Sequence, residues 1–312
     1  MDPMIITLIL LAFAIVMFVL EKIPLALTSM IVCIALVVTG VLSIEEAFEG
    51  FIDTNVILFV AMFIVGGALF ETGMANKLGG IVTKFARTER QLIVTIMVVV
   101  GAMSGFLSNT GTAAVLIPVV IGIAAKSGYS RSKLLMPLVF AAAMGGNISL
   151  IGAPGNLIAQ AALQDIGLNF AFFDYGKIGL PMLVAGILFF ATVGYRLLPD
   201  KPSVKTETAF DEEVDYSNVP AWKQYLALVI LVLTILAMIF EDVIGINLAI
   251  SGGIGAILLI LTGVISEKQA IRSIDMQTIF LFGGTLSLAK ALINFFFKCT
   301  ACSSCNQTRR IG

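Results

Sequence analysis

Two short polar segments, each inside an otherwise apolar stretch, hold the residues whose types could bind ions. One segment runs from Ser104 to Thr112 and reads Ser-Gly-Phe-Leu-Ser-Asn-Thr-Gly-Thr. Ser and Asn side chains supply oxygens for a sodium ion, and backbone amides at the start of a helix, near Thr110–Thr112, attract an anion. Ser104 lies one helical turn before Ser108, so both side chains can lie on one helix face. This segment is predicted to bind ions; the alternative is a Ser/Thr-rich contact between helices.

The other segment runs from Gly145 to Asn156 and reads Gly-Gly-Asn-Ile-Ser-Leu-Ile-Gly-Ala-Pro-Gly-Asn. Its proline removes a helix donor and its glycines loosen the backbone. The expected result is a discontinuous helix with carbonyls free for a cation and amides free for an anion. A simple proline kink accounts for Pro154 but does not explain why Asn147, Ser149 and Asn156 occur together.

The elements that position these segments are predicted to be transmembrane helices. Apolar residues make up 59% of the 312 and charged residues only 12%, against about 25% charged residues in soluble domains. A bilayer core requires roughly 20 apolar residues per helix, and in lipid the backbone must satisfy its own hydrogen bonds. The sequence therefore predicts an all-α polytopic membrane protein with spans at residues 4–20, 24–42, 56–70, 92–125, 134–163, 178–198, 225–240, 246–265 and 278–292.

Composition also argues against other functions. The net charge of −1 provides no basic face for nucleic acid. The chain has no histidine, and so it lacks the commonest general base and the commonest zinc ligand. Ser108 has no evident base beside it. These features favour passage of a substrate over chemistry on it, and we do not expect an enzyme.

The sequence resembles itself at an offset of about 223 residues. Thr39–Val41 matches Thr262–Val264, and Ser43 matches Ser266. Any two apolar helices look somewhat alike, but the polar loop that follows is also similar in both copies. The pattern therefore indicates an internal duplication.

Charge in the loops predicts the topology. Residues 43–53 contain acidic residues and no Lys or Arg, whereas the equivalent loop of the second copy holds Lys268 and Arg272. The positive-inside rule places the first loop outside and the second inside. Both flanks of 92–125 are basic, which predicts a helical hairpin that enters the membrane and returns. Five full spans then precede the second copy, so the repeat is predicted to be inverted.

The predicted organisation has four parts. Residues 1–198 form the first repeat, with the re-entrant hairpin at 92–125 and the broken helix at 134–163. Residues 199–221 form a cytoplasmic linker, and 222–292 begin the second repeat. Residues 293–312 form an atypical tail with Cys299, Cys302 and Cys305. A structural zinc site needs four ligands, so no metal beyond sodium is expected, and a reading-frame change or a truncated gene model explains the tail better.

The motif Ser108-Asn109-Thr110, followed some forty residues later by Gly152–Asn156, resembles those of the divalent anion:sodium symporter family. This is the citrate-transporter-like group of the ion transporter superfamily, and the resemblance covers residues 5–292. The second motif usually reads Gly-Thr/Ser-Pro-Pro-Asn and here reads Gly-Ala-Pro-Gly-Asn. This departure bears on the substrate more than on the fold.

The resemblance implies sodium-coupled symport of a small anion, a di- or tricarboxylate or sulfate, by a homodimer in the plasma (inner) membrane. It also implies an elevator-type movement of the hairpin domain. Sodium would be the coupling ion, bound by Ser104, Ser108, Asn109 and the backbone of Gly152. Together, the motif and the two helix starts give the candidate substrate ligands Asn109, Thr110, Gly111, Thr112, Pro154 and Asn156.

Two other functions stay open. An arsenite or anion permease, or a cation/proton antiporter, could use the same scaffold. An antiporter would be expected to have an acidic residue at the site, and neither polar segment contains Asp or Glu. The other alternative is a truncated membrane remnant that does not transport, because family members carry a second hairpin and a second broken helix, which are expected beyond Leu292.

Overall fold

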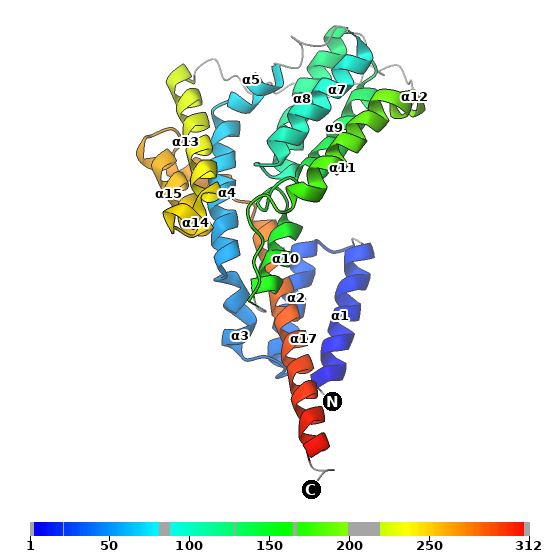
Figure 1. Ribbon diagram of the computed structural model, residues 1–312, viewed down its shortest axis with the longest axis vertical. Helices are drawn as coiled ribbons and strands as arrows, with labels where there is room; N and C mark the ends of the chain where they lie inside the picture. Colours follow the sequence, from blue (N-terminus) through cyan, green and yellow to red (C-terminus); the bar gives the residue numbers. More distant parts are fainter. Residues whose placement is uncertain are drawn as a thin grey trace. The chain divides into compact units, whose positions relative to one another are not determined.

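The computed structural model describes residues 3–20, 22–80, 88–127, 129–164, 167–198 and 219–308, and all regular secondary structure in these ranges is helical (Figure 1). The helices long and apolar enough to cross a membrane are Pro3–Leu20, Ile44–Glu71, Gly176–Leu197, Ala221–Ile239 and Met276–Asn294. The predicted all-α, polytopic class is therefore confirmed. Most of the predicted linker and the side chains of the three tail cysteines lie outside the described residues.

The helices bear the labels of Figure 1. In chain order they are α1 (Pro3–Leu20), α2 (Leu25–Val38), α3 (Ile44–Phe48), η1 (Glu49–Phe51), α4 (Thr54–Glu71), α5 (Met74–Gly80), α7 (Glu89–Ser104), α8 (Asn109–Ser127), α9 (Arg131–Gly145), α10 (Pro154–Gln164), α11 (Gly176–Phe189), η2 (Phe190–Gly194), α12 (Tyr195–Leu197), α13 (Ala221–Ile239), α14 (Glu241–Ile244), α15 (Leu248–Leu261), α16 (Glu267–Arg272) and α17 (Met276–Thr308).

The chain divides into two compact units. Unit 1 comprises Met1–Ile57 and Asp275–Gly312, and unit 2 comprises Leu58–Ile274. In unit 1, α2, α3 and α17 pack around a core that includes Cys33, Leu36 and Leu288. Helices separated by more than two hundred residues of sequence thus share one core.

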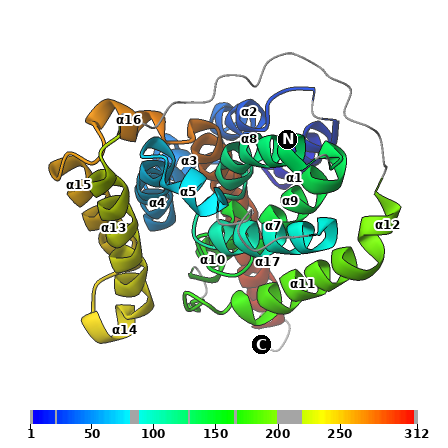
Figure 2. The same cartoon turned by 90° about the horizontal axis from the view of Figure 1, so that it is seen from above.

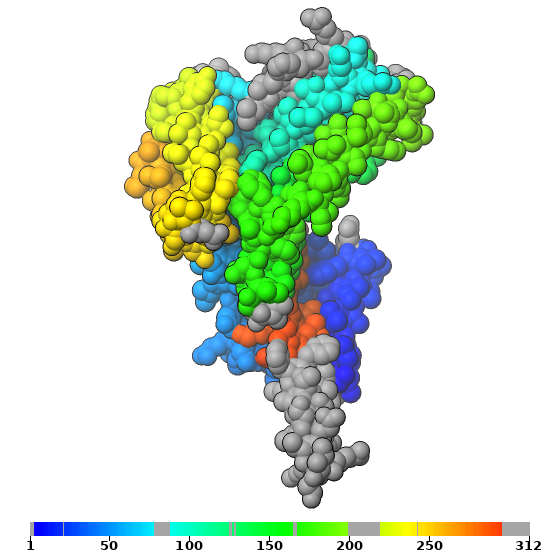
Figure 3. Space-filling model, viewed as in Figure 1, coloured from blue at the N-terminus to red at the C-terminus, as the bar shows by residue number. Residues whose placement is uncertain are grey.

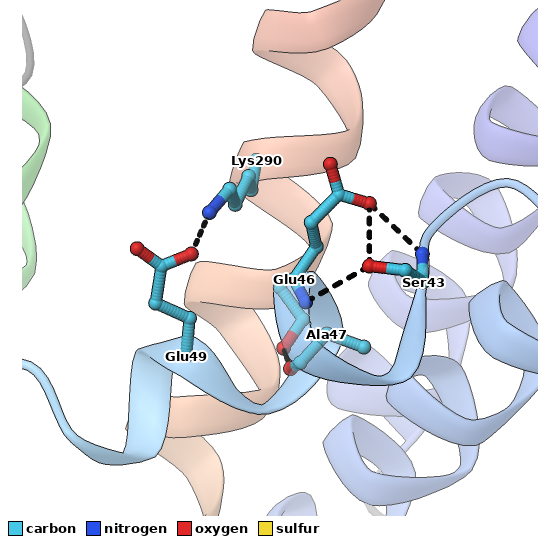
Figure 4. A network of polar contacts seen from close by, with 6 residues as sticks. Ser43, Glu46, Ala47, Glu49 and Lys290 are labelled. Carbon is cyan, nitrogen blue, oxygen red and sulfur yellow. Dashed lines mark hydrogen bonds and ion pairs between the residues drawn. The ribbon is translucent and has the colours of Figure 1, made fainter.

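Polar contacts join α3 to α17 inside unit 1 (Figure 4). Ser43 begins α3 with a capping box: its hydroxyl accepts from the Glu46 amide at 3.2 Å, and its own amide donates to the Glu46 carboxylate at 2.9 Å. Further along, Lys290 of α17 forms an ion pair with Glu49. The Ser287 hydroxyl donates to the Ala47 carbonyl. These contacts satisfy polar groups at both ends of a five-residue helix.

Unit 2 contains the four-helix group α7, α8, α9 and α11, which Figures 1 and 2 both show gathered together. Its core consists of aliphatic side chains that repeat at helical spacing, such as Ile93, Ile96 and Val100 on α7. Leu134 and Leu138 of α9 lie in the same core and are fully buried. This apolar packing holds α7 and α9 side by side, and both helices end at the polar segments.

The turn after α2 and the turn after α15 have the same local structure. Gly40 and Gly263 both have positive φ, at 72° and 68°, a conformation that suits glycine. Ser43 and Ser266, each three residues later, both form capping boxes. The duplication and its inverted topology remain predictions, and this match at an offset of 223 supports the duplication.

Candidate functional site

The two polar segments are helix breaks that lie against one another in unit 2. Residues 105–108 separate α7 from α8, and residues 146–153 separate α9 from α10. The buried Ser149 hydroxyl donates to the Gly105 carbonyl, which joins one break to the other. Each break leaves helix-terminal backbone groups without intrahelical partners, and the other break supplies part of what they need.

Local sequence explains where each helix starts. The Ser108 hydroxyl accepts from the Gly111 amide at 3.1 Å and so caps the first turn of α8. Pro154 is the first residue of α10, where its missing N–H costs nothing. The preceding helices both end at glycine, with Gly105 and Gly146 as C-caps.

The centre of the arrangement is the Asn109 side chain. In one orientation its amide oxygen accepts from the Ser104 hydroxyl at 2.6 Å. The same hydroxyl also lies 2.7 Å from the Ala142 carbonyl oxygen, but its one hydrogen can be donated to only one of the two. In the opposite orientation the amide nitrogen donates to the carbonyls of Ala142 at 3.1 Å and Gly152 at 3.0 Å. One terminal atom of Asn109 therefore faces a hydroxyl and two carbonyl oxygens.

Glycines allow this close approach. A Cβ at Gly145 of α9 would collide with the Gly101 backbone of α7, so the two helices can come so near only with glycine at position 145. A Cβ at Gly146 would collide with the Asn109 amide. The Gly152 backbone lies against Gly146 in the same way, since an added Cβ would be 2.5 Å from the Gly146 carbonyl oxygen.

Asn156 braces the second break from within. Its side-chain nitrogen donates to the carbonyls of Gly146 at 3.0 Å and Ser149 at 2.9 Å, and the residue is 5% exposed. The Gly146 carbonyl belongs to the C-cap of α9, and the Ser149 carbonyl lies within the break itself. The Asn156 amide is therefore engaged in holding the break.

The segment before α11 packs onto α10. Tyr175 donates its hydroxyl to the Asn156 carbonyl at 3.1 Å, and the Phe170 amide donates to the buried Gln160 side chain at 2.8 Å. The Leu150 amide donates to the Phe172 carbonyl at 2.9 Å. Partial burial raises the pKa of the Tyr175 hydroxyl, so it remains a neutral donor at physiological pH.

Three of the four predicted sodium ligands come together. Ser104, Asn109 and the Gly152 carbonyl are joined by the contacts above, whereas the hydroxyl of Ser108 is occupied by the Gly111 amide. Nothing in the sequence singled out the fourth oxygen, the Ala142 carbonyl. The glycine pair at 145–146 marks the end of α9, but the Ala142 carbonyl lies within the last turn of that helix and also accepts from the Gly146 amide at 3.2 Å.

The predicted substrate ligands occupy different environments. Thr110 is exposed and Pro154 is partly exposed at the start of α10. Thr112 is fully buried, and its hydroxyl has no hydrogen-bond partner among the described residues. The backbone amides of Gly111 and Thr112 are both occupied by Ser108, through its hydroxyl and its carbonyl.

Comparison of the chain with known proteins finds a family that it matches. The family model described as "Citrate transporter" matches residues 15–295. An uncharacterized transporter of Escherichia coli is 36% identical over 200 residues, which cover 64% of this chain and 33% of that protein. An uncharacterized transporter of Haemophilus influenzae is 27% identical over 305 residues, covering 91% of this chain and 64% of that protein.

A third relative carries a named activity. Sodium/sulfate cotransporter 1 of Chlamydomonas reinhardtii is 28% identical over 172 residues, covering 52% of this chain and 19% of that protein. The chain thus spans less than two thirds of the length of each of these relatives. Together with the long apolar helices, the family match identifies an integral, multi-pass membrane protein of a transporter family and not of an enzyme family.

Proposed function

The chain belongs to the citrate transporter family, and we propose that it acts in sodium-coupled symport of a small anion across the plasma membrane. The substrate class is a di- or tricarboxylate or sulfate, and the relative named as a sodium/sulfate cotransporter supports both the anion and the ion. The observation that carries the proposal is the group of oxygens around the end of the Asn109 side chain.

This group has the composition of a sodium site. With the Asn109 amide oxygen turned inward, it lies beside the Ser104 hydroxyl and the carbonyls of Ala142 and Gly152. Four neutral oxygens converge at a helix break, and unwound backbone carbonyls of this kind coordinate sodium in secondary transporters. Without a cation the amide nitrogen satisfies the same carbonyls. In this proposal, sodium coordinated by the four oxygens replaces the hydrogen bonds that the amide nitrogen makes to the Ala142 and Gly152 carbonyls.

The anion would bind beside the cation at the start of α8. The exposed Thr110 follows Asn109 directly, and the N-terminus of α8 presents the positive end of its dipole. The fully buried hydroxyl of Thr112, which has no hydrogen-bond partner in the described part of the chain, lies in the first turn of the same helix. In this proposal, Thr110 contacts the substrate directly, and Asn156 and Pro154 fix the facing break. A site for sodium next to an anion makes the binding of each favour the other.

The neutral chemistry of the site favours symport over proton-coupled exchange. A cation/proton antiporter needs a group that titrates, and neither 104–112 nor 145–156 contains Asp, Glu or His. A permease for an uncharged arsenic species would not need a cation site. Neither alternative predicts uptake of a di- or tricarboxylate or sulfate that is driven by a sodium gradient.

The test is uptake of radiolabelled succinate, citrate and sulfate into proteoliposomes, with a sodium or a choline gradient. We expect uptake that requires sodium, and its loss by tenfold or more in Asn109→Ala. Asn147→Ala is the matched control, because among the described residues the Asn147 side chain in the neighbouring break donates only to the Ala143 carbonyl of α9. Its uptake should stay close to that of the unchanged chain.

A second readout does not require transport. Sodium chloride should raise the unfolding temperature of the unchanged chain and of Asn147→Ala relative to choline chloride. The Asn109→Ala variant should show no such shift. Sodium-independent uptake, or no uptake of these anions by well-inserted protein, would overturn the symport proposal.

A further inference from the structure

Two arginines share one tyrosine at the end of the four-helix group where α7 begins and α12 ends. The guanidinium carbon of Arg90 lies 4.6 Å from the centre of the Tyr195 ring, and that of Arg196 lies 5.5 Å from it. The Arg196 Nε also donates to the Tyr195 hydroxyl at 2.9 Å. Two positive charges are thus held on one neutral side chain.

No carboxylate neutralises this pair within the described part of the chain. The adjacent acidic residue, Glu89, forms an ion pair with Lys133 at 3.5 Å. Neither Arg90 nor Arg196 takes part in an ion pair with another described residue. Guanidinium groups bind phosphate through paired N–H donors, so the arrangement is suited to a phosphate that lies between them.

The backbone before Tyr195 departs from the α-helix. Residues Phe190–Gly194 form a π-helical turn, in which the Tyr195 amide donates to the carbonyl of Phe190, five residues earlier. Such turns are rare, and many of them occur at functional sites. This turn sets the direction in which Tyr195 and Arg196 leave the helix, and it brings both of them to Arg90.

The surface beside the arginines is apolar. Leu188, Val193 and Leu197 are 59%, 52% and 71% exposed. Figure 3 shows α11 lying uncovered alongside α7. A ligand that fits both features has an anionic head and an apolar tail. A free phosphate ion would use only the arginines and gain nothing from the apolar strip.

The geometry points to a site for an anionic phospholipid, with its phosphate held by Arg90, Arg196 and the Tyr195 hydroxyl and its acyl chain along α11. The topology predicted from loop charge places residues 73–91 inside, so the lipid would belong to the cytoplasmic leaflet. The site is separate from the helix breaks and does not depend on the proposed transport activity.

Titration of the purified full chain with lipid, followed by native mass spectrometry, tests the proposal. The probes are phosphatidylglycerol, phosphatidylcholine and inorganic phosphate. The double variant Arg90→Gln/Arg196→Gln should bind phosphatidylglycerol about thirtyfold more weakly, since each basic residue near a lipid surface contributes about 1 kcal/mol. Lys223→Gln/Arg272→Gln removes the same charge elsewhere and should leave the affinity within about twofold.

Two further variants cover the case in which the double variant does not fold. Tyr195→Phe keeps the ring and both charges, and Arg196→Lys keeps the charge but not the planar fork. Each should weaken phosphatidylglycerol binding, and neither should change phosphatidylcholine binding. An unchanged phosphatidylglycerol affinity in the variants, an equal loss in the control pair, or displacement of the lipid by millimolar inorganic phosphate would each overturn the proposal.

Discussion

Gly146 is the residue at which the site leaves the least room. Its Cα hydrogen faces the Asn109 amide, and its carbonyl accepts from Asn156 while its backbone touches Gly152. The break can close around the Asn109 side chain only if no side chain stands here. Asn109 is thereby held where a hydroxyl and two carbonyls meet.

Gly146→Ala should therefore destabilise the chain. The added methyl group collides with the Asn109 side chain, and overpacking of this kind costs about 1–3 kcal/mol. Gly155→Ala is the control: nothing lies within 4 Å of a Cβ at this position in the first turn of α10, and the change should be neutral or stabilise by up to about 1 kcal/mol. Thermal unfolding in detergent measures the stability of both variants. Equal unfolding temperatures for Gly146→Ala and Gly155→Ala would show that the contact with Asn109 does not limit what position 146 can hold.

Residue types in the sequence pointed to part of this site. Ser104 and Asn109 stood out because hydroxyl and amide groups are unusual inside an apolar stretch, and the structure brings them together. The Ala142 carbonyl carries no such signal, because every residue has one. The sequence favoured the Ser108 hydroxyl as a sodium ligand, but in the structure this hydroxyl caps α8. Which of the two roles a serine takes depends on the local backbone geometry.

A short helix follows the turn in each of the two segments that match at an offset of 223 residues, α3 in the first and α16 in the second. Ser43 begins α3 and Ser266 begins α16, each with a side chain that accepts from the amide three residues later. Such a bond satisfies a donor that the helix itself leaves unpaired. The cap thus fixes the first turn of the short helix that leads into the next long helix.

Ser43→Ala and Ser266→Ala should each lower the free energy of unfolding by about 0.5–2 kcal/mol, the usual cost of losing an N-cap. Ser43→Thr keeps the hydroxyl and should retain most of the stability. Chemical denaturation followed by circular dichroism provides the measurement. A full loss in the threonine variant would show that packing around Ser43, and not its cap, is what matters.

The helix breaks themselves were predictable. Glycine and proline marked residues 104–112 and 145–156, and the breaks occupy 105–108 and 146–153. The π-helical turn at Phe190–Gly194 had no such mark, because its sequence reads as an ordinary apolar helix. It forms where η2 packs against α7, a contact between residues about one hundred positions apart.

At the scale of the molecule, each unit contains a contact between two helices, and the two contacts involve matching positions of the two copies. In unit 1, Gly284 of α17 lies against the backbone of Ser29 on α2. In unit 2, Gly252 of α15 lies against Ala61 of α4. Ser29 and Gly252 are related by the same offset of 223. In both units the second span of one copy thus packs on the third span of the other copy, as a duplicated chain would allow.

The inverted repeat predicts opposite exposure of matched positions. Glu45→Cys and Lys268→Cys lie at equivalent places, 223 residues apart, and both native residues are exposed. In a chain otherwise free of cysteine, a membrane-impermeant maleimide should label the Glu45→Cys variant only from outside and the Lys268→Cys variant only from inside. Thr88→Cys and Ser132→Cys, which flank the predicted hairpin, should both label from inside. Labelling of the two matched positions from the same side would rule out inversion.

The π-helical turn has a consequence for the chain's tolerance of length changes. A π-helical turn contains one residue more than an α-helical turn, so deletion of one residue from Phe190–Gly194 would let α11 continue as a regular α-helix. The five-residue step of the π turn covers about the same rotation as a four-residue step of an α-helix, so Tyr195 would keep nearly its present direction after this deletion. The span would still be long enough for a membrane. Deletion of one residue from this turn should thus preserve the tyrosine–arginine cluster, whereas deletion of one residue from the α-helical part of α11 would rotate every later residue by about 100° and turn Tyr195 away from Arg90.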